Sequence, residues 1–454
     1  MKIQSNRNIV SGHIIVPGSK SHTIRALILA AMADGVSHIK NPLPSNDCLS
    51  TVEAVSQIGA DVDTQSSGGS VWTVTGAGRN LHLPDDVVNV GNSGSLMYFL
   101  CPVLATLPGW CVFTGDESIR TRPVTHLVDS LNQLGAGAFS VNRSGTPPFV
   151  FRGPLDVSKK LVTDGKLSQY ISGFMMAASR LDGRLEIELT DPKETPYLTM
   201  TKLWLDSVGV KSGISDDFRH IHVDGPVQIK GFDCTVPSDW EAVAFPLVAA
   251  LVSGGNVVVD NVDFSGSQGD SMIVDVLVSA GADIVLDGKN SSLTAKGGKR
   301  LSAAHLPEKT LAVDISAFPD AICALAAAAS YIEGNVVISD VEICRKKETD
   351  RVKAMVSELG KLGADIHEDG DSLVIHGHSP VLEDGSPNPE FVLHGGSVES
   401  YKDHRIAMSL ACFGLGLPEG ESVVINDAES CSVSFPHFFE VMNGIGAGFS
   451  QVQA

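Results

Sequence analysis

The chain of 454 residues lacks the marks of several special classes of protein. It has no run of eighteen apolar residues, so no segment predicts a transmembrane helix. The first residues, MKIQSNRNIVSGHIIVPGSK, contain no apolar core of the kind that a signal peptide has. The eight cysteines are scattered without a CxxC pair, which argues against both a disulfide framework and a zinc site. We therefore expect a cytoplasmic protein.

Positive charge is also scarce in this sequence. The 33 lysines and arginines stand against 53 aspartates and glutamates, which gives a formal net charge of −20. Nucleic acid and anionic membranes bind proteins through clustered positive charge, so we expect neither as a partner. An anionic small molecule could bind only at a local basic island, which makes each cluster of lysine and arginine informative.

One pattern recurs six times along the chain. An apolar stretch at helical spacing ends in a glycine among small residues, and strand patterns follow several of these stops. Successive stops lie 72 to 83 residues apart, at Gly59, Gly135, Gly209, Gly281, Gly363 and Gly446. A glycine at this position is typical of a helix that ends in a left-handed residue. The sequence therefore predicts six α/β units of similar size.

Each unit also contains a helical stretch that is apolar nearly all round. One example is EAVAFPLVAALVS, and another is DAICALAAAASYI, which begins at Asp320. Asp320 could either cap its helix or hold a substrate hydroxyl. Helices of this kind are buried, so six of them predict helices bundled inside and sheets outside. The even spacing and matching order favour this repeat over six unrelated α/β crossovers.

Five segments with glycine or concentrated charge lie at or beside the starts of these buried helices. They span residues 17–25, 91–97, 114–123, 345–351 and 401–405. A helix start offers unpaired N–H groups and partial positive charge, which suit a phosphate or a carboxylate. Each segment alone also has an ordinary interpretation, such as a capped helix, a turn, a solvated loop or a surface salt-bridge ladder. The first lacks the GxxxxGK[ST] spacing, so nucleotide hydrolysis is not supported.

The last two segments hold the most concentrated charge. Lys347 and Arg351 are four residues apart, so in a helix they would share one face, with Glu348 beside them as a candidate acid or base. Asp403 precedes His404, an arrangement that suits a polarised imidazole. A Ser-His-Asp triad is the weaker interpretation, because no nucleophile elbow accompanies the pair.

Taken together, the segments resemble those of the 5-enolpyruvylshikimate-3-phosphate synthase family, the 3-phosphoshikimate 1-carboxyvinyltransferases. The resemblance rests on GSKSHTIRA, GNSGS, IRTRPV, LSQY, FPDA, KKETDR and KDHR, in the family's order and over nearly the whole chain. It implies a two-domain inside-out α/β barrel, in which each domain has three βαβαββ repeats with buried helices and outer sheets. It further implies one domain of residues 1–17 and 238–454, completed by the N-terminal strand, a second of residues 18–237, and an active site in the cleft between them.

The resemblance also implies a reaction and a set of site residues. The enolpyruvyl group of phosphoenolpyruvate moves to the 5-hydroxyl of shikimate 3-phosphate, phosphate leaves, no metal or organic cofactor is needed, and a monomer is expected. The catalytic residues would be Lys20, Asp320 and Glu348. Phosphoenolpyruvate would be held by Lys20, Gly94, Arg122, Gln169, Arg351 and Arg405, with support from Asn92, Asp403 and His404. The acceptor would be held by Ser21, Arg25, Ser168, Gln169, Tyr197, Asp320 and Lys347.

The chain departs from the family pattern at Leu167, Glu194, Ile343, Val433 and the pair Tyr98-Phe99. Leu167 replaces a serine of the family's Ser-Ser-Gln, and Glu194 puts a carboxylate where a serine is usual. A carboxylate beside a phosphate repels it unless it points away or is paired. Shikimate 3-phosphate is the expected acceptor, and the alternative is an enolpyruvyl transferase of the same fold that acts on a different acceptor.

Two other hypotheses are weaker. The related UDP-N-acetylglucosamine enolpyruvyl transferases have Lys-Asn where this chain has Lys20-Ser21, and usually a reactive cysteine where it has Glu117-Ser118. A catalytically inactive binding protein would have no reason to keep the charged residues of the motifs, among them Lys20, Glu348, Asp320 and Arg405. We therefore expect an active transferase.

Overall fold

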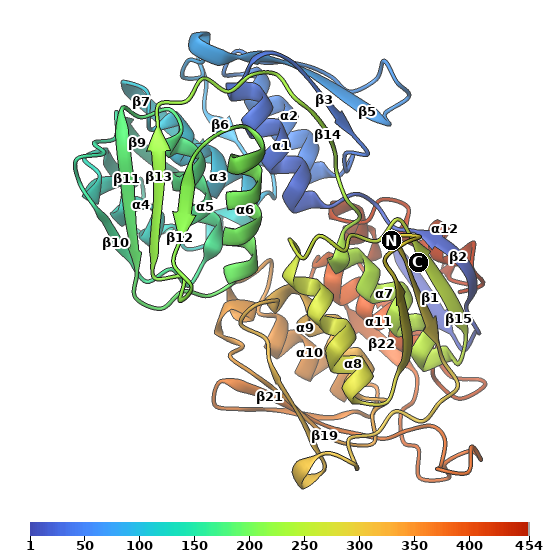
Figure 1. The fold of residues 1–454 in the computed structure, drawn as a ribbon. Helices are drawn as coiled ribbons and strands as arrows, with labels where there is room; N and C mark the ends of the chain where they lie inside the picture. The colour runs from blue at the N-terminus through green and yellow to red at the C-terminus, as the bar shows by residue number, and fades with distance from the viewer. Residues whose placement is uncertain (453–454) are drawn as a thin grey trace. The chain divides into compact units, whose positions relative to one another are not determined.

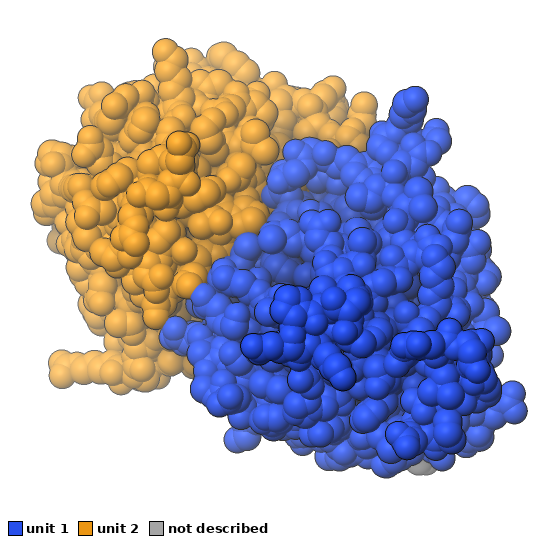
Figure 2. Space-filling model, turned by 60° about the horizontal axis from the view of Figure 1, so that its bottom comes forward, with its two compact units in different colours: residues 1–17, 238–454 blue, residues 18–237 orange. Residues whose placement is uncertain are grey.

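The computed structural model describes residues 1–452. The chain divides into two compact units, coloured separately in Figure 2. Unit 1 comprises Met1–Pro17 and Ser238–Ala454, and unit 2 comprises Gly18–Pro237. The chain therefore begins in unit 1, builds the whole of unit 2, and then returns to complete unit 1.

Each unit contains three helices that are buried along nearly their whole length. In unit 2 they are α1 (Lys20–Met32), α3 (Gly94–Leu104) and α5 (Ser168–Ala178). In unit 1 they are α7 (Trp240–Ser253), α9 (Ile322–Ala329) and α11 (His404–Gly414). These helices come from the six stretches predicted to be apolar all round. Figure 1 shows α7, α9 and α11 together inside unit 1.

In the described part of the chain, six further helices bury only part of their surface. They are α2 (Asn46–Ser56), α4 (Thr125–Gln133), α6 (Thr195–Ser207), α8 (Ile273–Ser279), α10 (Arg351–Gly360) and α12 (Phe438–Asn443). Each is followed by one of the six predicted glycine stops, and every one of these glycines has a positive φ, between 81° and 104°. A side chain is strained in this conformation, so glycine lets each helix end sharply before its strand.

The strands of residues 1–452 form six four-stranded sheets with one common pattern. The three sheets of unit 2 have the orders β14 (Asp233–Thr235), β3 (Asp34–Lys40), β5 (Val71–Ala77), β4 (Asp61–Asp63); β6 (Val88–Asn89), β7 (Gly109–Thr114), β9 (Phe149–Gly153), β8 (Gly137–Ser140); and β10 (Leu161–Thr163), β11 (Gly183–Leu189), β13 (His220–Gly225), β12 (Ser212–Ile214). Those of unit 1 have the orders β2 (Ser11–Ile15), β15 (Asn256–Asp260), β17 (Ser292–Lys296), β16 (Asp283–Asp287); β18 (Thr310–Asp314), β19 (Gly334–Ser339), β21 (Ser372–Gly377), β20 (Asp365–Asp369); and β22 (Gly396–Glu399), β23 (Ser422–Asn426), β1 (Lys2–Asn6), β24 (Ser450–Val452). In every sheet the first two strands are parallel and the other pairs are antiparallel.

Three strands complete sheets whose other members are distant in the sequence. The N-terminal strand β1 lies between β23 and β24, antiparallel to both. Strand β2 pairs in parallel with β15, although the whole of unit 2 separates them in the chain. Strand β14, the last strand of unit 2, pairs in parallel with β3, its first. These three sheets therefore reach four strands only after the chain has passed through other repeats, whereas the other three are each built from four strands that are consecutive in the chain.

Each unit has its own hydrophobic core between its buried helices and the inner faces of its three sheets. Exposure alternates along the strands, as in β19, where Val336 and Ile338 are 2% and 0% exposed between more open neighbours. Burying one such side chain contributes about 1.5–3 kcal/mol. The structure confirms buried helices with outer sheets, arranged within residues 1–452 as six separate sheets. No helix in this part of the chain is long and apolar enough to cross a bilayer.

Candidate active site

Three of the five predicted segments, 17–25, 91–97 and 401–405, lie at the N-terminal ends of the buried helices α1, α3 and α11, whereas 114–123 and 345–351 precede the partly buried helices α4 and α10. Lys20, Gly94 and Ser168 are the first residues of α1, α3 and α5 in unit 2. In unit 1, Asp320 lies in the short turn that leads into α9, and Asp403 is the N-cap of α11. In both units the candidate chemistry therefore gathers where helices present unpaired N–H groups.

Arg351 is the centre of the charged cluster in unit 1. It is the first residue of α10 and is completely buried. Its guanidinium donates to both oxygens of Asp403, from Nε at 2.8 Å and from Nη2 at 3.3 Å. It also donates to Asp320 Oδ1 and Glu348 Oε2, each at 2.5 Å. Burial alone would lower the pKa of Arg351, but Asp403 and the other two carboxylates raise it well above its usual value.

Asp320, in the turn η5 (Pro319–Ala321), lies among three cations. Its carboxylate accepts a hydrogen bond from Lys347 Nζ at 3.1 Å and one from Arg351, and it lies 3.2 Å from Arg405 Nε. Burial favours the neutral acid, yet Lys347 and Arg351 outweigh burial and lower the pKa of Asp320 to about 2. The side chain makes no capping hydrogen bond to its helix, so the helix-cap interpretation of Asp320 is wrong.

The prediction that Lys347 and Arg351 share one helix face is also wrong. Helix α10 begins only at Arg351, because Asp350 accepts a hydrogen bond from the first turn and caps it. Lys347 lies before the helix, at the end of the turn η6 (Glu342–Lys346). The two cations nevertheless meet, because both bind the Asp320 carboxylate.

His404 and Arg405 lie in the first turn of α11 and are 1% and 3% exposed. Asp403 caps this helix by accepting from the backbone N of Arg405 at 2.9 Å, and its Oδ1 lies 3.9 Å from His404 Nδ1. The Arg405 guanidinium pairs with Glu241 from the first turn of α7. Sequence reasoning missed Glu241, since an acidic residue in a first helical turn is ordinary.

A buried carboxylate also supports the loop that leads into α11. Glu358 of α10 is fully buried and accepts hydrogen bonds from the backbone N of Glu399 at 2.9 Å and from the Tyr401 hydroxyl at 2.7 Å. Tyr401 and Lys402 both have positive φ, 54° and 57°, a conformation that costs free energy for residues with side chains. Glu358 therefore holds a strained turn directly before Asp403.

In unit 2, Lys20 lies beside an acidic partner from the next helix. Its Nζ is 3.3 Å from Asp47 Oδ2 in α2, and the two residues are only 8% and 3% exposed. A carboxylate at this distance offsets part of the cost of burying the ammonium group. The neighbouring Ser21 accepts from Arg25 Nη1 through its carbonyl at 3.0 Å. Asp47 was not predicted, because its segment resembles an ordinary capped helix start.

Gly94 makes room for Arg122. A Cβ at Gly94 would lie 2.7 Å from Arg122 Nη1, closer than atoms of these types approach. Nη2 of Arg122 donates to Asn92 Oδ1 at 3.3 Å and to Ser118 Oγ at 3.4 Å. Asn92 in turn donates to Asp116 Oδ2 at 2.7 Å. The glycine-rich segment and the arginine segment therefore form one cluster.

Arg25 is buried in unit 2, and within residues 1–452 its hydrogen-bond partners are all neutral. It donates to Thr201 Oγ1 at 2.8 Å, and to Ser172 Oγ and the Tyr197 carbonyl at 3.3 Å each. Its guanidinium also lies 4.4 Å from the centre of the Phe99 ring. Burial lowers the pKa of Arg25 to about 9. A bound anion nearby would favour the charged form of Arg25, so this guanidinium is a candidate partner for an anionic ligand in unit 2.

Two departures from the family pattern compensate for each other. Leu167 is the N-cap of α5 and makes no side-chain capping hydrogen bond. Glu194, which is 2% exposed and has a φ of 51°, supplies the cap instead. Its Oε2 accepts from the backbone N and from Oγ of Ser168 at 3.0 and 2.9 Å. A carboxylate therefore already occupies the anion-binding end of α5, where Gln169 donates from Nε2 to Ser95 Oγ at 3.0 Å.

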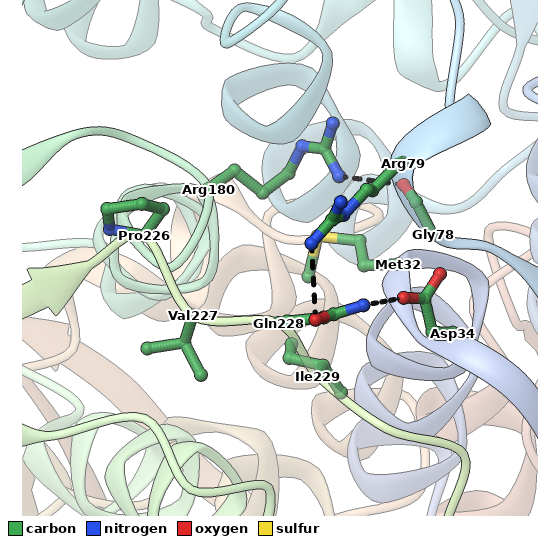
Figure 3. Close-up of a pocket in the computed structure, with 9 residues that line it drawn as sticks. All are labelled: Met32, Asp34, Gly78, Arg79, Arg180, Pro226, Val227, Gln228 and Ile229. Carbon is green, nitrogen blue, oxygen red and sulfur yellow. Dashed lines mark hydrogen bonds between the residues drawn. The ribbon is translucent and has the colours of Figure 1, made fainter.

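Unit 2 also contains a cavity of about 460 Å³, shown in Figure 3. It lies at the opposite helix ends, since Met32 is the last residue of α1 and Arg180 follows α5. Arg180 donates to Thr106 Oγ1 at 3.2 Å and to the Gly78 carbonyl at 3.4 Å. These bonds fasten the C-terminal ends of the helices, and none of the predicted site residues lines the cavity.

Comparison with known proteins gives consistent matches over the full chain. A family model described as EPSP synthase (3-phosphoshikimate 1-carboxyvinyltransferase) matches residues 5–442. The chain is 37% identical over 450 residues to a 3-phosphoshikimate 1-carboxyvinyltransferase of Acetivibrio thermocellus, and 99% of both chains is covered. It is 34% identical over 447 residues to that of Methanothermobacter thermautotrophicus, with 98% of both covered. A solved EPSP synthase from Acinetobacter baumannii superimposes with a TM-score of 0.80 at 26% identity, covering 100% of both chains.

Proposed function

The chain belongs to the EPSP synthase (3-phosphoshikimate 1-carboxyvinyltransferase) family, and on this premise we propose how its residues carry out the reaction. The enzyme transfers the enolpyruvyl group of phosphoenolpyruvate to the 5-hydroxyl of shikimate 3-phosphate and releases phosphate. Both substrates are polyanions, whereas the protein carries a net charge of −20. Binding therefore depends on local concentrations of lysine and arginine.

The observation that carries the proposal is the gathering of cations at the N-terminal ends of helices in each unit, with Lys20 at the start of α1, Arg351 at the start of α10 and Arg405 in the first turn of α11. We propose that these ends face a shared cleft between the two domains when substrates bind. Phosphoenolpyruvate is then held by Lys20 and Arg122 from unit 2, and by Arg351 and Arg405 from unit 1. Gly94 leaves room for the Arg122 guanidinium, and Asp403 keeps the Arg351 guanidinium in place.

The reaction moves protons in two stages. The methylene carbon of phosphoenolpyruvate gains a proton while the acceptor hydroxyl loses its own and attacks the central carbon. The resulting tetrahedral intermediate then loses a proton from its methyl group as the bond to phosphate breaks. Lys20 and Glu348 carry the protons at carbon in this proposal. Asp320, kept ionised by its low pKa, accepts the hydrogen bond of the 5-hydroxyl and takes its proton once attack makes the oxygen acidic.

The acceptor binds at the helix starts of unit 2 and at the unit 1 cations. Arg25 supplies positive charge that has no carboxylate partner within residues 1–452. Its neighbours Ser21, Ser168 and Tyr197 line the acceptor in this proposal, together with Gln169 and Lys347. No metal or organic cofactor enters any step, because the cations themselves neutralise the charge that develops.

The test is phosphate release from phosphoenolpyruvate with shikimate 3-phosphate, with shikimate, and with neither. We expect release only with shikimate 3-phosphate, and loss of release in Lys20→Ala and Glu348→Ala. Lys347→Ala should also reduce phosphate release, because Lys347 holds the acceptor in this proposal. Its matched control is Lys346→Ala, which should leave release unchanged, because Lys346 is exposed and pairs with Glu342 at 2.6 Å. Release with shikimate instead would assign a different acceptor. Equal loss of release in Lys347→Ala and Lys346→Ala would contradict the proposed site.

We further propose that the enzyme is a cytoplasmic monomer. Within residues 1–452 all eight cysteines are free, and seven are buried, which suits a reducing compartment. Size-exclusion chromatography with light scattering should give the chain mass of 47.8 kDa. Twice that mass would contradict the monomer.

A further inference from the structure

Three side chains that bind metals lie together on the outer face of a sheet in unit 1. Asp365 and His367 are two residues apart in β20, so they point to the same face. His376 in β21 is the direct cross-strand partner of Asp365. One ligand atom from each of the three lies within 4.8 Å of the other two. The next residues on the opposite face, Ile366 and Ile375, are buried in the core, which fixes the orientation of the three polar ones.

A fourth side chain orients one of the two imidazoles. Nδ1 of His376 lies 2.6 Å from Oδ1 of Asn335, its partner on the neighbouring strand β19. An amide oxygen only accepts, so Nδ1 carries the proton and the lone pair of His376 is on Nε2. A hydrogen bond of this kind is what holds metal-binding histidines in other proteins. The His367 ring lies beside that of His376, with the ring centres 5.7 Å apart.

We propose that Asp365, His367 and His376 bind one divalent transition-metal ion. Two imidazoles with one carboxylate suit zinc, nickel or copper, whereas magnesium and calcium prefer oxygen ligands only. Asp365 and His367 are exposed, so water completes the coordination. The ion would join β20 to β21 and thereby clip the hairpin at its open end.

This site is separate from the proposed substrate site. One row of cross-strand partners crosses the sheet at the beginnings of β18 and β19, and it consists of Thr310, Asn335, His376 and Asp365. Asp320 and the charged segment around Lys347 follow the opposite ends of the same two strands. A metal ion in the row therefore cannot touch the reacting groups, and its role is structural.

The test uses full-length protein without an affinity tag, stripped of metal with EDTA and titrated with zinc chloride by calorimetry. We expect one ion per chain, and at least a tenfold weaker affinity in His367→Ala and in His376→Ala. Asn335→Ala should weaken binding by about tenfold, since it removes only the orienting group. Catalytic activity should stay unchanged in all three variants.

The matched control is His13→Ala. His13 also lies exposed on an outer sheet of unit 1 beside an aspartate, with Nδ1 3.0 Å from Asp260 Oδ2, but it belongs to no three-ligand group in residues 1–452. This variant should bind zinc as the unmodified protein does. The proposal is overturned if the unmodified protein takes up no zinc, or if His367→Ala and His13→Ala bind it with equal affinity. His367 is exposed, so its loss does not disturb the core and the comparison remains decisive.

Discussion

The Glu194→Ser variant should bind shikimate 3-phosphate more tightly and fold less stably than the unmodified enzyme. Glu194 caps α5 through two hydrogen bonds to Ser168, and serine is too short to replace its carboxylate. Loss of a helix N-cap costs about 1 kcal/mol, which for a unit of this size lowers the melting temperature by roughly 2–4 °C.

The expected change in affinity follows from the same geometry. Two unit charges on the order of 5 Å apart repel by about 3 kcal/mol at an effective dielectric constant of 20, so a phosphate at Ser168 would displace the Glu194 carboxylate. Displacing the carboxylate costs about the cap energy, about 1 kcal/mol, and this cost weakens acceptor binding. Replacing the Glu194 carboxylate should therefore lower the KM for shikimate 3-phosphate by about fivefold, with kcat unchanged.

The assay is steady-state phosphate release with shikimate 3-phosphate varied at saturating phosphoenolpyruvate, together with thermal denaturation. The double variant Glu194→Ser with Leu167→Ser restores a capping hydroxyl at the N-cap of α5 and should recover the lost stability. A raised KM for shikimate 3-phosphate in Glu194→Ser would refute the reasoning, because it would mean that the carboxylate itself binds the acceptor.

Three further outcomes are expected. Gly94→Ala should raise the KM for phosphoenolpyruvate by about tenfold, because its Cβ would lie 2.7 Å from Arg122; an unchanged KM would show that Arg122 moves freely. Tyr401→Phe removes the hydrogen bond to Glu358 and should raise the same KM about threefold without altering the circular dichroism spectrum, whereas a change confined to stability would count against positioning. Asp320 has a folded pKa of about 2 against an ordinary 3.8, so it contributes about 2 kcal/mol of stability that is present above about pH 4 and lost as the pH falls towards 2. Urea unfolding should therefore show the advantage of the unmodified protein over Asp320→Asn shrinking across that range, and parallel curves would disprove it.

The sequence predicted the repeated architecture because that information is local. Apolar residues at helical spacing identify buried helices such as α9, and a glycine such as Gly363 identifies where a helix ends. The motifs around Lys20 and Arg351 lie at helix starts, as their positions before apolar stretches predicted. Errors arose where a helix begins later than its charge pattern indicates, as at Lys347, which precedes α10.

Only the tertiary structure decided which distant groups are partners. The partners lie far apart in the chain: Glu194 is 26 residues from Ser168, Glu358 is 43 from Tyr401, and Arg405 is 164 from Glu241. Any of many acidic residues could have taken these places, because spacing encodes a helix face but does not encode contact between separate elements. The sequence by itself determined the repeated helices and the motifs at their starts. The packing of those elements determined which carboxylate meets which cation, since such contacts form only when separate helices and loops are brought together in the folded chain.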